Sequence, residues 1–278
     1  MTQPDNTRFE SFRQLHAGPG VFVIPNPWDA GSARLLEQMG FKALATTSAG
    51  LAFALGRPDG SNAVSRAETM ANAAAIAGAV SLPVSADLEN GFGPHPEDCA
   101  ETIRQAAAAG LAGGSIEDAT GVESDPIFGF EAAVDRVRAA AEVAHGLGRP
   151  FLLTARSENF LHGRPDLKDT IRRLQAFQEA GADVLFAPGI KTAADIGTVV
   201  RSVDRPVNVV MGLAGVPLTV AQLEALGVRR ISVGGSLARA ALGGFLRAAQ
   251  EIVAHGSFGY AADATPHGEL NAKFKRPH

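Results

Sequence analysis

The chain has 278 residues, of which 46% are hydrophobic, 25 are basic and 29 are acidic, giving a formal net charge of −4. This length is usual for one α/β barrel, and the composition allows a large core. The balanced charge, with no run of Lys or Arg, argues against nucleic acid as the main partner.

The N-terminal residues 1–16 are polar and carry charges of both signs, so we expect no signal peptide. No stretch approaches the roughly 18 apolar residues that a membrane helix requires, so we expect no membrane partner. Cys99 is the only cysteine, which excludes an intrachain disulfide and a cysteine-based zinc site. We interpret Cys99 as a small buried apolar residue and expect a cytoplasmic protein.

Eight short apolar or β-branched runs alternate along the chain with alanine-rich stretches of helical spacing. The expected strands are residues 21–24, 43–47, 84–86, 114–116, 151–154, 184–186, 207–210 and 231–233. Glycines end the helical runs before the even-numbered strands, where a left-handed cap is favoured. These are Gly40, Gly110, Gly181 and Gly227. Prolines, which are tolerated at strand starts, introduce strands three, five and seven.

The alternation predicts a parallel sheet, and eight units favour closure into a (βα)8 TIM barrel. A doubly wound open sheet is the structural alternative. No linker rich in Pro, Gly or Ser divides the chain, so we expect residues 1–278 to form one barrel domain with short polar extensions at both ends. Residues 255–278 show little periodicity, and we expect them to lie over the barrel or a neighbouring subunit.

Acidic side chains collect where the expected strands end, which is where the active site of such a barrel lies. Asp87 and Glu89 follow strand three, Glu117 follows strand four, and Arg156 follows strand five. Strand seven adds Asn208 as a candidate substrate-binding residue. Mg²⁺ takes one or two carboxylates directly and keeps waters that further carboxylates orient. The pattern therefore indicates a Mg²⁺ site, for which Mn²⁺ can substitute.

Several of these features also have a purely structural interpretation. The planar fork of Arg156 suits a carboxylate or phosphoryl group, but it could instead pair with Glu117 or Glu158. The turn at Gly234 and Gly235 could cradle an anion or simply allow tight packing at a helix start. We interpret Asp118 and Glu97 as helix-cap or first-turn charges.

The remaining ionisable residues argue against two other kinds of barrel site. None of the five lysines lies at a strand end, which disfavours a Schiff-base aldolase. Only His95 and His162 fall in loops near the expected mouth, so a histidine-rich metal site has no support.

Five segments, in this order and at these strand ends, resemble the isocitrate lyase/phosphoenolpyruvate mutase superfamily across residues 20–245. They are residues 25–30 (PNPWDA), 56–59 (GRPD), 87–93 (DLENGFG), 116–118 (IED) and 154–157 (TARS). The resemblance implies a Mg²⁺-dependent barrel that makes or breaks C–C or C–P bonds next to pyruvate-like enolates. It also implies that residues 236–254 form a helix exchanged between the subunits of a homodimer or homotetramer. The apolar stripe of that segment would then be buried on the partner.

The resemblance also implies roles for individual residues. Asp87 corresponds to the direct metal ligand, and Arg156 corresponds to the cation that faces the substrate. The carboxylates that hold the metal's waters would be Asp59, Glu89 and Glu117, and we take Arg156, Asp59 and Glu117 as the catalytic set. The carboxylate pocket of the substrate would be formed by Ser48, Ala49 and Gly50, whose backbone N–H groups suit an anion.

The chain departs from the superfamily in the loop after strand four. Isocitrate and methylisocitrate lyases carry a cysteine there, and phosphoenolpyruvate mutase carries a loop of the Lys-Thr-Asn-Ser type. Residues 119–126 read ATGVESDP and contain neither pattern. Residues 187–189, after strand six, read APG, where many members place Glu or His. Both specific assignments are therefore disfavoured.

The simplest remaining function is the cleavage of a small 2-oxo acid through a pyruvate-like enolate, either as a C–C lyase or as a decarboxylase of an oxaloacetate-like acid. The alternatives are a C–P bond enzyme, such as a phosphonopyruvate hydrolase or a phosphonomutase, and a non-catalytic barrel that binds 2-oxo acids. A phosphosugar barrel is a further class, disfavoured because the carboxylates at the mouth would repel phosphate.

Overall fold

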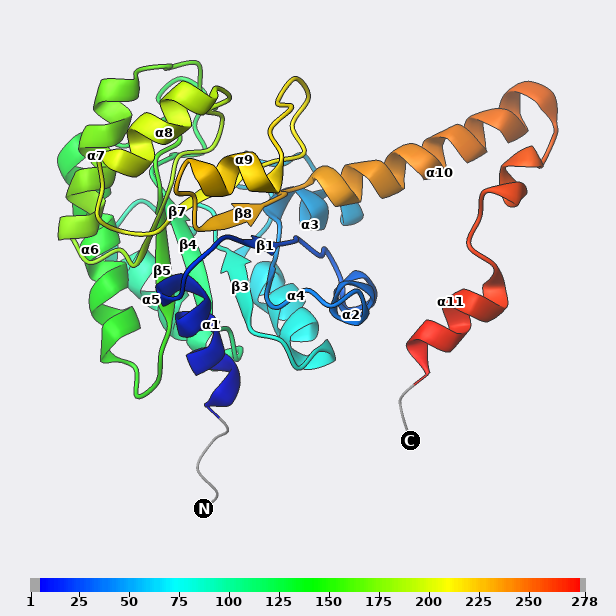
Figure 1. The fold of residues 1–278 in the computed structure, drawn as a ribbon, viewed down its shortest axis with the longest axis horizontal. Coiled ribbons are helices and arrows are strands. Elements are labelled where there is room, and N and C mark those ends of the chain that lie inside the picture. The colour runs from blue at the N-terminus through cyan, green and yellow to red at the C-terminus, as the bar shows by residue number, and fades with distance from the viewer. Residues whose placement is uncertain (1–5, 276–278) are drawn as a thin grey trace.

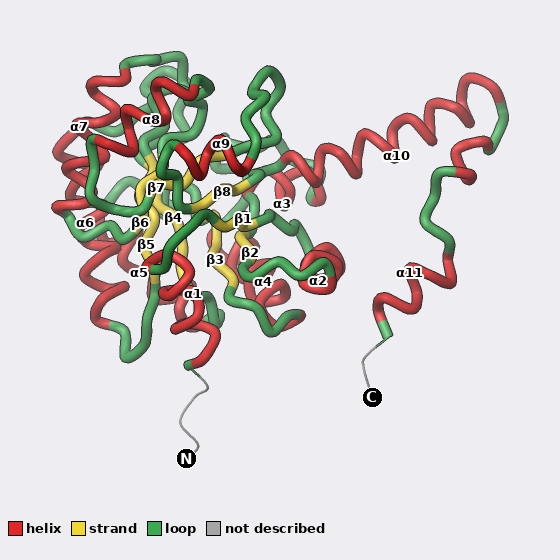
Figure 2. Tube along the Cα trace, in the orientation of Figure 1, coloured by secondary structure: helices red, strands yellow, loops and turns green. Residues whose placement is uncertain are grey.

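The computed structural model describes residues 6–275. Eight parallel strands form one sheet in the order β1-β8-β7-β6-β5-β4-β3-β2. The strands are β1 (Phe22–Ile24), β2 (Leu44–Ala45), β3 (Val84–Asp87), β4 (Gly113–Glu117), β5 (Leu152–Arg156), β6 (Val184–Phe186), β7 (Val207–Val210) and β8 (Arg230–Ser232). Ala45 N donates to Pro25 O at 3.1 Å across the remaining seam. The sheet is thus a nearly closed barrel, and the prediction of a (βα)8 barrel is confirmed (Figures 1 and 2).

Helices alternate with the strands, and most of them surround the sheet (Figure 1). They are α1 (Thr7–Ala17), α2 (Ala30–Gln38), α3 (Ser48–Ala54), α4 (Arg66–Ala79), α5 (Pro96–Ala108), α6 (Phe130–Gly146), α7 (Leu167–Glu179), α8 (Ala193–Arg201), α9 (Val220–Ala225), α10 (Ser236–His255), the 3-10 helix η1 (Gly259–Ala262) and α11 (His267–Phe274). The four glycines predicted to end helices have φ values from +82° to +106°. These values lie in the left-handed region that glycine enters without a Cβ clash, so the predicted C-caps are confirmed.

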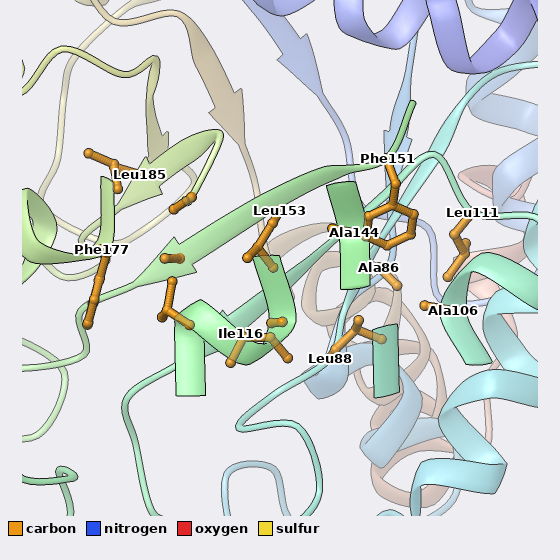
Figure 3. Packing of buried hydrophobic residues seen from close by; sticks show 14 of the residues in the cluster. Ala86, Leu88, Ala106, Leu111, Ile116, Ala144, Phe151, Leu153, Phe177 and Leu185 are labelled. Carbon is orange, nitrogen blue, oxygen red and sulfur yellow. The ribbon is translucent and has the colours of Figure 1, made fainter. Parts of the chain in front are cut away.

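The main core lies between the sheet and the helices around it (Figure 3). Ile116 and Leu153 from the strands and Phe177 from α7 are at most 1% exposed. A second cluster closes the amino end of the barrel, where Phe9 and Phe12 of α1 pack against Ile24, Ala43 and Val184. Residues 7–17 are therefore not the polar extension that the composition predicts. Phe9, Phe12 and Leu15 recur every three residues and give an otherwise polar helix one apolar face.

The C-terminal segment leaves the barrel as a long arm. α10 projects away from the barrel, and α11 lies apart from the strands (Figure 1). The tail is more regular than predicted, because it contains η1 and α11. α11 is tied to α2 of the same chain, since Gln38 Nε2 donates to Lys273 O at 2.6 Å and Arg34 lies over the ring of Phe274. Among residues 6–275, no helix combines the length and apolarity needed to cross a membrane.

Candidate active site

Three neighbouring strands end in the charged residues that the sequence singles out. Asp87 is the last residue of β3, Glu117 of β4 and Arg156 of β5. Glu117 pairs directly with Arg156 in the parallel register, and Asp87 pairs with Ser115. Because parallel strands present their carboxyl ends at one edge, these side chains meet at the mouth of the barrel.

Arg156 lies at the centre of this cluster and forms three ion pairs. Its guanidinium nitrogens lie 2.9 Å from Asp87 Oδ1, 2.9 Å from Glu117 Oε2 and 2.9 Å from Glu158 Oε1. Burial opposes the charge on Arg156, yet the three carboxylates raise its pKa well above the usual value. Arg156 forms the structural ion pairs, and it also lines the pocket described below, where it could face a substrate.

The carboxylates at this rim outnumber their cation. Asp59 and Glu89 join Asp87, Glu117 and Glu158 around Arg156. Burial, and then the charges of Asp87 and Asp59, raise the pKa of Glu89 to about 7. Burial also raises the pKa of Asp59, with Asp87 as the next cause, and it raises that of Glu117 well above the ordinary range. One guanidinium among five carboxyl groups leaves an excess of negative charge that a bound cation would relieve.

The loop that carries Glu89 is held in a strained conformation. Glu89 has φ +46° and Phe92 has φ +61°, and both lie in the left-handed region. A non-glycine residue there costs of the order of 1–3 kcal/mol and persists only where surrounding contacts impose it. Those contacts come from the buried Arg136, whose guanidinium donates to Asn90 O and, at 2.8 Å, to Gly93 O. The loop is therefore fixed beside Asp87 rather than free.

The predicted carboxylate pocket, residues 48–50, forms the first turn of α3. The side chain of Thr47 caps this helix by accepting from Gly50 N at 3.3 Å. Ser48 N donates to Asp87 Oδ2 at 3.2 Å, and the Ser48 side chain bonds to Asp59. A Cβ on Gly50 would lie 2.7 Å from both Thr47 and Trp28, so only glycine fits there. Ser48 thus ties α3 to the two carboxylates.

A pocket of about 350 Å³ opens at this end of the barrel. The predicted site residues that line it are Ser48, Ala49, Asp59, Asp87, Arg156 and Asn208. Glu89, Glu117 and Gly50 are not among its lining residues, although Glu117 contacts Arg156 directly. The structure therefore brings six of the nine predicted residues to one cavity and places the other three around it.

Asn26 and Arg230 also line the pocket, and neither is among the site residues predicted from the sequence. Asn26 Oδ1 accepts from Val233 N and Gly234 N, each at 2.9 Å, and Asn26 Nδ2 donates to Thr46 O. The Gly234 N–H is thereby taken by the protein itself. A Cβ on Gly235 would lie 2.9 Å from Ala49 Cβ, so close packing accounts for this turn. The position of Asn26 directly after the first strand, in the segment PNPWDA, could have marked it as a site residue.

Arg230 enters the interior of the barrel from β8. It is 6% exposed and lines the pocket. Two consecutive arginines, Arg229 and Arg230, stand at the start of the eighth strand. Because successive strand residues face opposite sides, one of the two had to point inward. This alternation could have marked one of the two arginines as a residue of the barrel interior.

Other candidates lie outside this cluster. The interpretation of Asp118 as a helix-cap or first-turn charge is wrong, because Asp118 follows β4 and the next helix begins only at Phe130. Asp118 pairs with Arg173 at 3.0 Å and accepts from Glu158 N, while burial raises its pKa to about 7. Glu97 is exposed in the first turn of α5, as predicted. Cys99 is buried in the same helix, and burial raises the pKa of its thiol to about 11. Among residues 6–275, no three His, Cys, Asp or Glu side chains converge as direct ligands of one metal ion.

The chain is similar to known proteins over most of its length. A family model described as phosphoenolpyruvate phosphomutase matches residues 12–253. A solved structure from Burkholderia cenocepacia J2315, of a protein provisionally described as a lyase/mutase, shares 56% identity and a TM-score of 0.95, covering 98% of this chain and 97% of that one. Oxaloacetate decarboxylase of Bradyrhizobium diazoefficiens is 30% identical over 72% of this chain and 70% of its own length. The structure of oxaloacetate acetylhydrolase in complex with oxalate has a TM-score of 0.86 at 25% identity, covering 96% of this chain and 93% of that one.

Proposed function

The chain belongs to the phosphoenolpyruvate phosphomutase family, within the isocitrate lyase/phosphoenolpyruvate mutase superfamily, and we propose that it is a Mg²⁺-dependent enzyme acting on a small 2-oxo acid. The reaction is the cleavage of a C–C bond, including decarboxylation of an oxaloacetate-like acid, through a pyruvate-like enolate. The relatives named for oxaloacetate chemistry support the substrate class. The observation that carries the proposal is the excess of carboxylates around Arg156 at the pocket.

The donor set at the rim fits a hard divalent cation. All the candidate donors are carboxylate oxygens, which Mg²⁺ prefers. Burial is the main cause of the raised pKa values of Asp59, Glu89 and Glu117, and neighbouring carboxylates raise them further. Asp87 is the direct ligand in this proposal. Asp59, Glu89 and Glu117 would hold the ion's water molecules by accepting hydrogen bonds. When bound, the metal supplies Lewis acidity at the 2-oxo group.

The protein's own residues then stabilise the charge that develops on the substrate. In a decarboxylation the bond between C3 and the departing carboxylate breaks, CO₂ leaves, and the electron pair of that bond moves into the enolate, whose oxygen gains negative charge. Arg156, already charged and fixed by three carboxylates, donates hydrogen bonds to that oxygen without reorganising. Protonation of the enolate at C3 by water completes the conversion to the pyruvate-type product.

No thiol or lysine is placed to protonate a leaving group. The loop after β4 is closed on itself, since Thr120 N donates to Pro126 O at 2.9 Å and Phe128 N to Asp118 O at 2.8 Å. Its residues 119–128 contain no Cys, Lys or His. The only thiol, that of Cys99, is buried and protonated at neutral pH. A substrate whose bond breaks without acid assistance therefore suits this site better than isocitrate or methylisocitrate.

A substrate panel tests the reaction. We expect NMR to show pyruvate-type products from oxaloacetate or a related 2-oxo diacid only when Mg²⁺ or Mn²⁺ is present. Glu97→Gln, in the exposed first turn of α5, is the matched control and should retain full turnover. Product from phosphonopyruvate alone would replace the proposal with C–P chemistry. An absence of product from every acid, with 2-oxo acid binding retained, would indicate a binding barrel.

We also propose that the enzyme is a homo-oligomer, dimer or tetramer, in which α10 packs on a partner. Phe245 and Leu246 are 66% and 63% exposed, and Val253 is 82% exposed. Exposed apolar surface of this kind is typical of a protein–protein interface. Sedimentation at micromolar concentration should give no monomer. An active, monodisperse monomer would contradict the exchange of α10.

A further inference from the structure

The interior of the barrel beneath the mouth is polar. Side chains from five strands meet there, all at most 8% exposed. They are Ser85, Ser115, Thr154, Asn208, Arg230 and Ser232. Barrel interiors of this type are ordinarily filled by layers of bulky branched apolar residues. All of these residues except Thr154 line the same pocket as Asp87 and Arg156. The pocket therefore continues from the acidic rim down into a layer of hydroxyl and amide groups.

Arg230 is the one charged residue of that layer, and its partners are all neutral. Its Nε donates to Asn208 Oδ1 at 2.9 Å, and one terminal nitrogen donates to Thr154 Oγ1 at 3.0 Å. The other terminal nitrogen lies 3.3 Å from His16 Nε2. Within residues 6–275, no carboxylate lies within ion-pairing distance of this guanidinium.

The histidine beside Arg230 is an acceptor and not a second cation. His16 Nδ1 lies 2.8 Å from Phe12 O, which can only accept, so Nδ1 carries the hydrogen and Nε2 accepts from Arg230. Burial, with the charge of Arg230 as the next cause, lowers the pKa of His16 to about 3. The ring is therefore neutral at physiological pH. Burial lowers the pKa of Arg230 to about 9, so the guanidinium remains charged.

A buried charge without a counter-ion is costly, and such charges in proteins are normally paired. A guanidinium has five N–H donors, and the three contacts above leave two of them available. The pocket gives an entering ligand access to this group. We infer that Arg230 binds the second carboxylate of a diacid substrate, the one that does not chelate the metal at Asp87.

This inference rests on the proposed function and narrows it to 2-oxo diacids. It also predicts which bond such a site breaks most readily. A carboxylate lost as CO₂ gives up its negative charge in the transition state. Pairing it with Arg230 therefore stabilises the ground state more than the transition state. The site therefore favours diacids that keep this carboxylate after C–C cleavage, and oxaloacetate should be turned over with a low KM and a low kcat.

Two matched ligands test the inference in the presence of Mg²⁺. Oxaloacetate and 2-oxobutanoate have the same four-carbon chain, and only oxaloacetate has the second carboxylate. Calorimetry should show oxaloacetate binding at least about tenfold more tightly to the wild type, as expected for a charge-assisted hydrogen bond. Arg230→Gln should remove this preference and leave 2-oxobutanoate binding unchanged. The variant should also raise the KM for oxaloacetate without lowering kcat.

A second variant separates the inference from a folding defect. Asn208→Asp places a carboxylate next to Arg230, at the position where Oδ1 now accepts its 2.9 Å hydrogen bond. We expect this internal counter-ion to raise the melting temperature and to abolish the preference for oxaloacetate. A variant that is less stable than wild type, or that retains the preference, would overturn the inference.

Measurements without metal distinguish failure of this inference from failure of the proposed function. Without Mg²⁺, malonate should raise the melting temperature of the wild type and not that of Arg230→Gln, whether or not any 2-oxo acid is turned over. Stabilisation by chloride equal to that by malonate would show a site for free inorganic anions and would overturn the assignment to a substrate carboxylate. No stabilisation by either anion, together with equal binding of the two four-carbon acids, would overturn it as well.

Discussion

At the mouth of the barrel five carboxyl groups surround the guanidinium of Arg156, whereas two residues earlier along β5 the hydroxyl of Thr154 faces Arg230, which has only neutral partners. The two arginines occupy the same pocket in opposite electrostatic surroundings. At the mouth the carboxylates outnumber their one arginine, whereas among residues 6–275 no carboxylate pairs with the arginine of the interior. A metal ion and a diacid would together supply the missing partners, which is why the two layers are best understood as the two ends of one binding site.

The largest effect should follow from removing the metal ligand at the mouth. Asp87→Ala deletes the only carboxylate proposed to bind the ion directly, so turnover should fall about a thousandfold, or about 4 kcal/mol in the barrier. The melting temperature should change little, because Arg156 retains Glu117 and Glu158 as partners. Steady-state kinetics at saturating Mg²⁺ measures this. Activity within about tenfold of the wild type would remove the assignment of Asp87.

Arg156→Lys should have the next largest effect. Lysine keeps the positive charge but loses the planar fork that contacts three carboxylates, so it cannot hold the same fixed geometry. We expect kcat to fall about a hundredfold, as for loss of one preorganised oxyanion donor. If KM alone rose, Arg156 would be a uniform binding contact and not a stabiliser of the enolate.

The two layers should also contribute to stability with opposite dependence on pH. The pKa of Glu89 is raised to about 7 in the fold, so the folded protein binds this proton more tightly and gains stability as pH falls from about 7 towards 4.5. The pKa of His16 is lowered to about 3, so its unfolded form takes up the proton first, and stability is lost as pH falls below 6.5.

Urea unfolding of the metal-free protein between pH 5 and 7 checks these signs. Glu89→Gln should remove a stabilising contribution to the unfolding free energy that grows as the pH falls. His16→Gln should remove a destabilising contribution that grows over the same pH range. The two variants should therefore shift the pH profile of unfolding free energy in opposite directions relative to the wild type. Parallel shifts would show that at least one of the two protonation states is assigned wrongly.

Cys99→Ser should have the smallest effect. The thiol is buried in α5, its pKa is raised to about 11, and it contacts Asn90 O rather than the pocket. We expect turnover within about twofold of the wild type, since the substitution touches no proposed catalytic group. Inactivation by a thiol reagent, prevented by substrate, would place Cys99 in the reaction and contradict this account.

Much of the mouth was predictable because it depends on local rules. The ends of parallel strands meet at one edge, so Asp87, Glu117 and Arg156 could be placed together from the strand boundaries alone. The positive φ values at Gly40 and Gly181 follow equally from helix termination before a strand. These inferences need only the position of a residue within its own element.

The interior was not predictable because it depends on long-range pairing. Arg230 contacts His16 and Thr154, residues that only barrel closure brings beside it. Asn26 accepts hydrogen bonds from the N–H groups of Val233 and Gly234, so these groups are not available to an anion at that turn. No periodicity in the chain marks these contacts. The direction in which Arg230 points was open until the register of β8 against β7 was known.

Metal binding is the most direct test of the central claim, that the mouth of the pocket is a divalent-cation site built on Asp87. Titration of the metal-free protein with Mn²⁺, followed by electron paramagnetic resonance, should show one saturable site per chain that Mg²⁺ displaces. Asp87→Asn should abolish this site, whereas Arg230→Gln should leave it intact. Binding that is unsaturable, or that survives Asp87→Asn with unchanged affinity, would contradict the account.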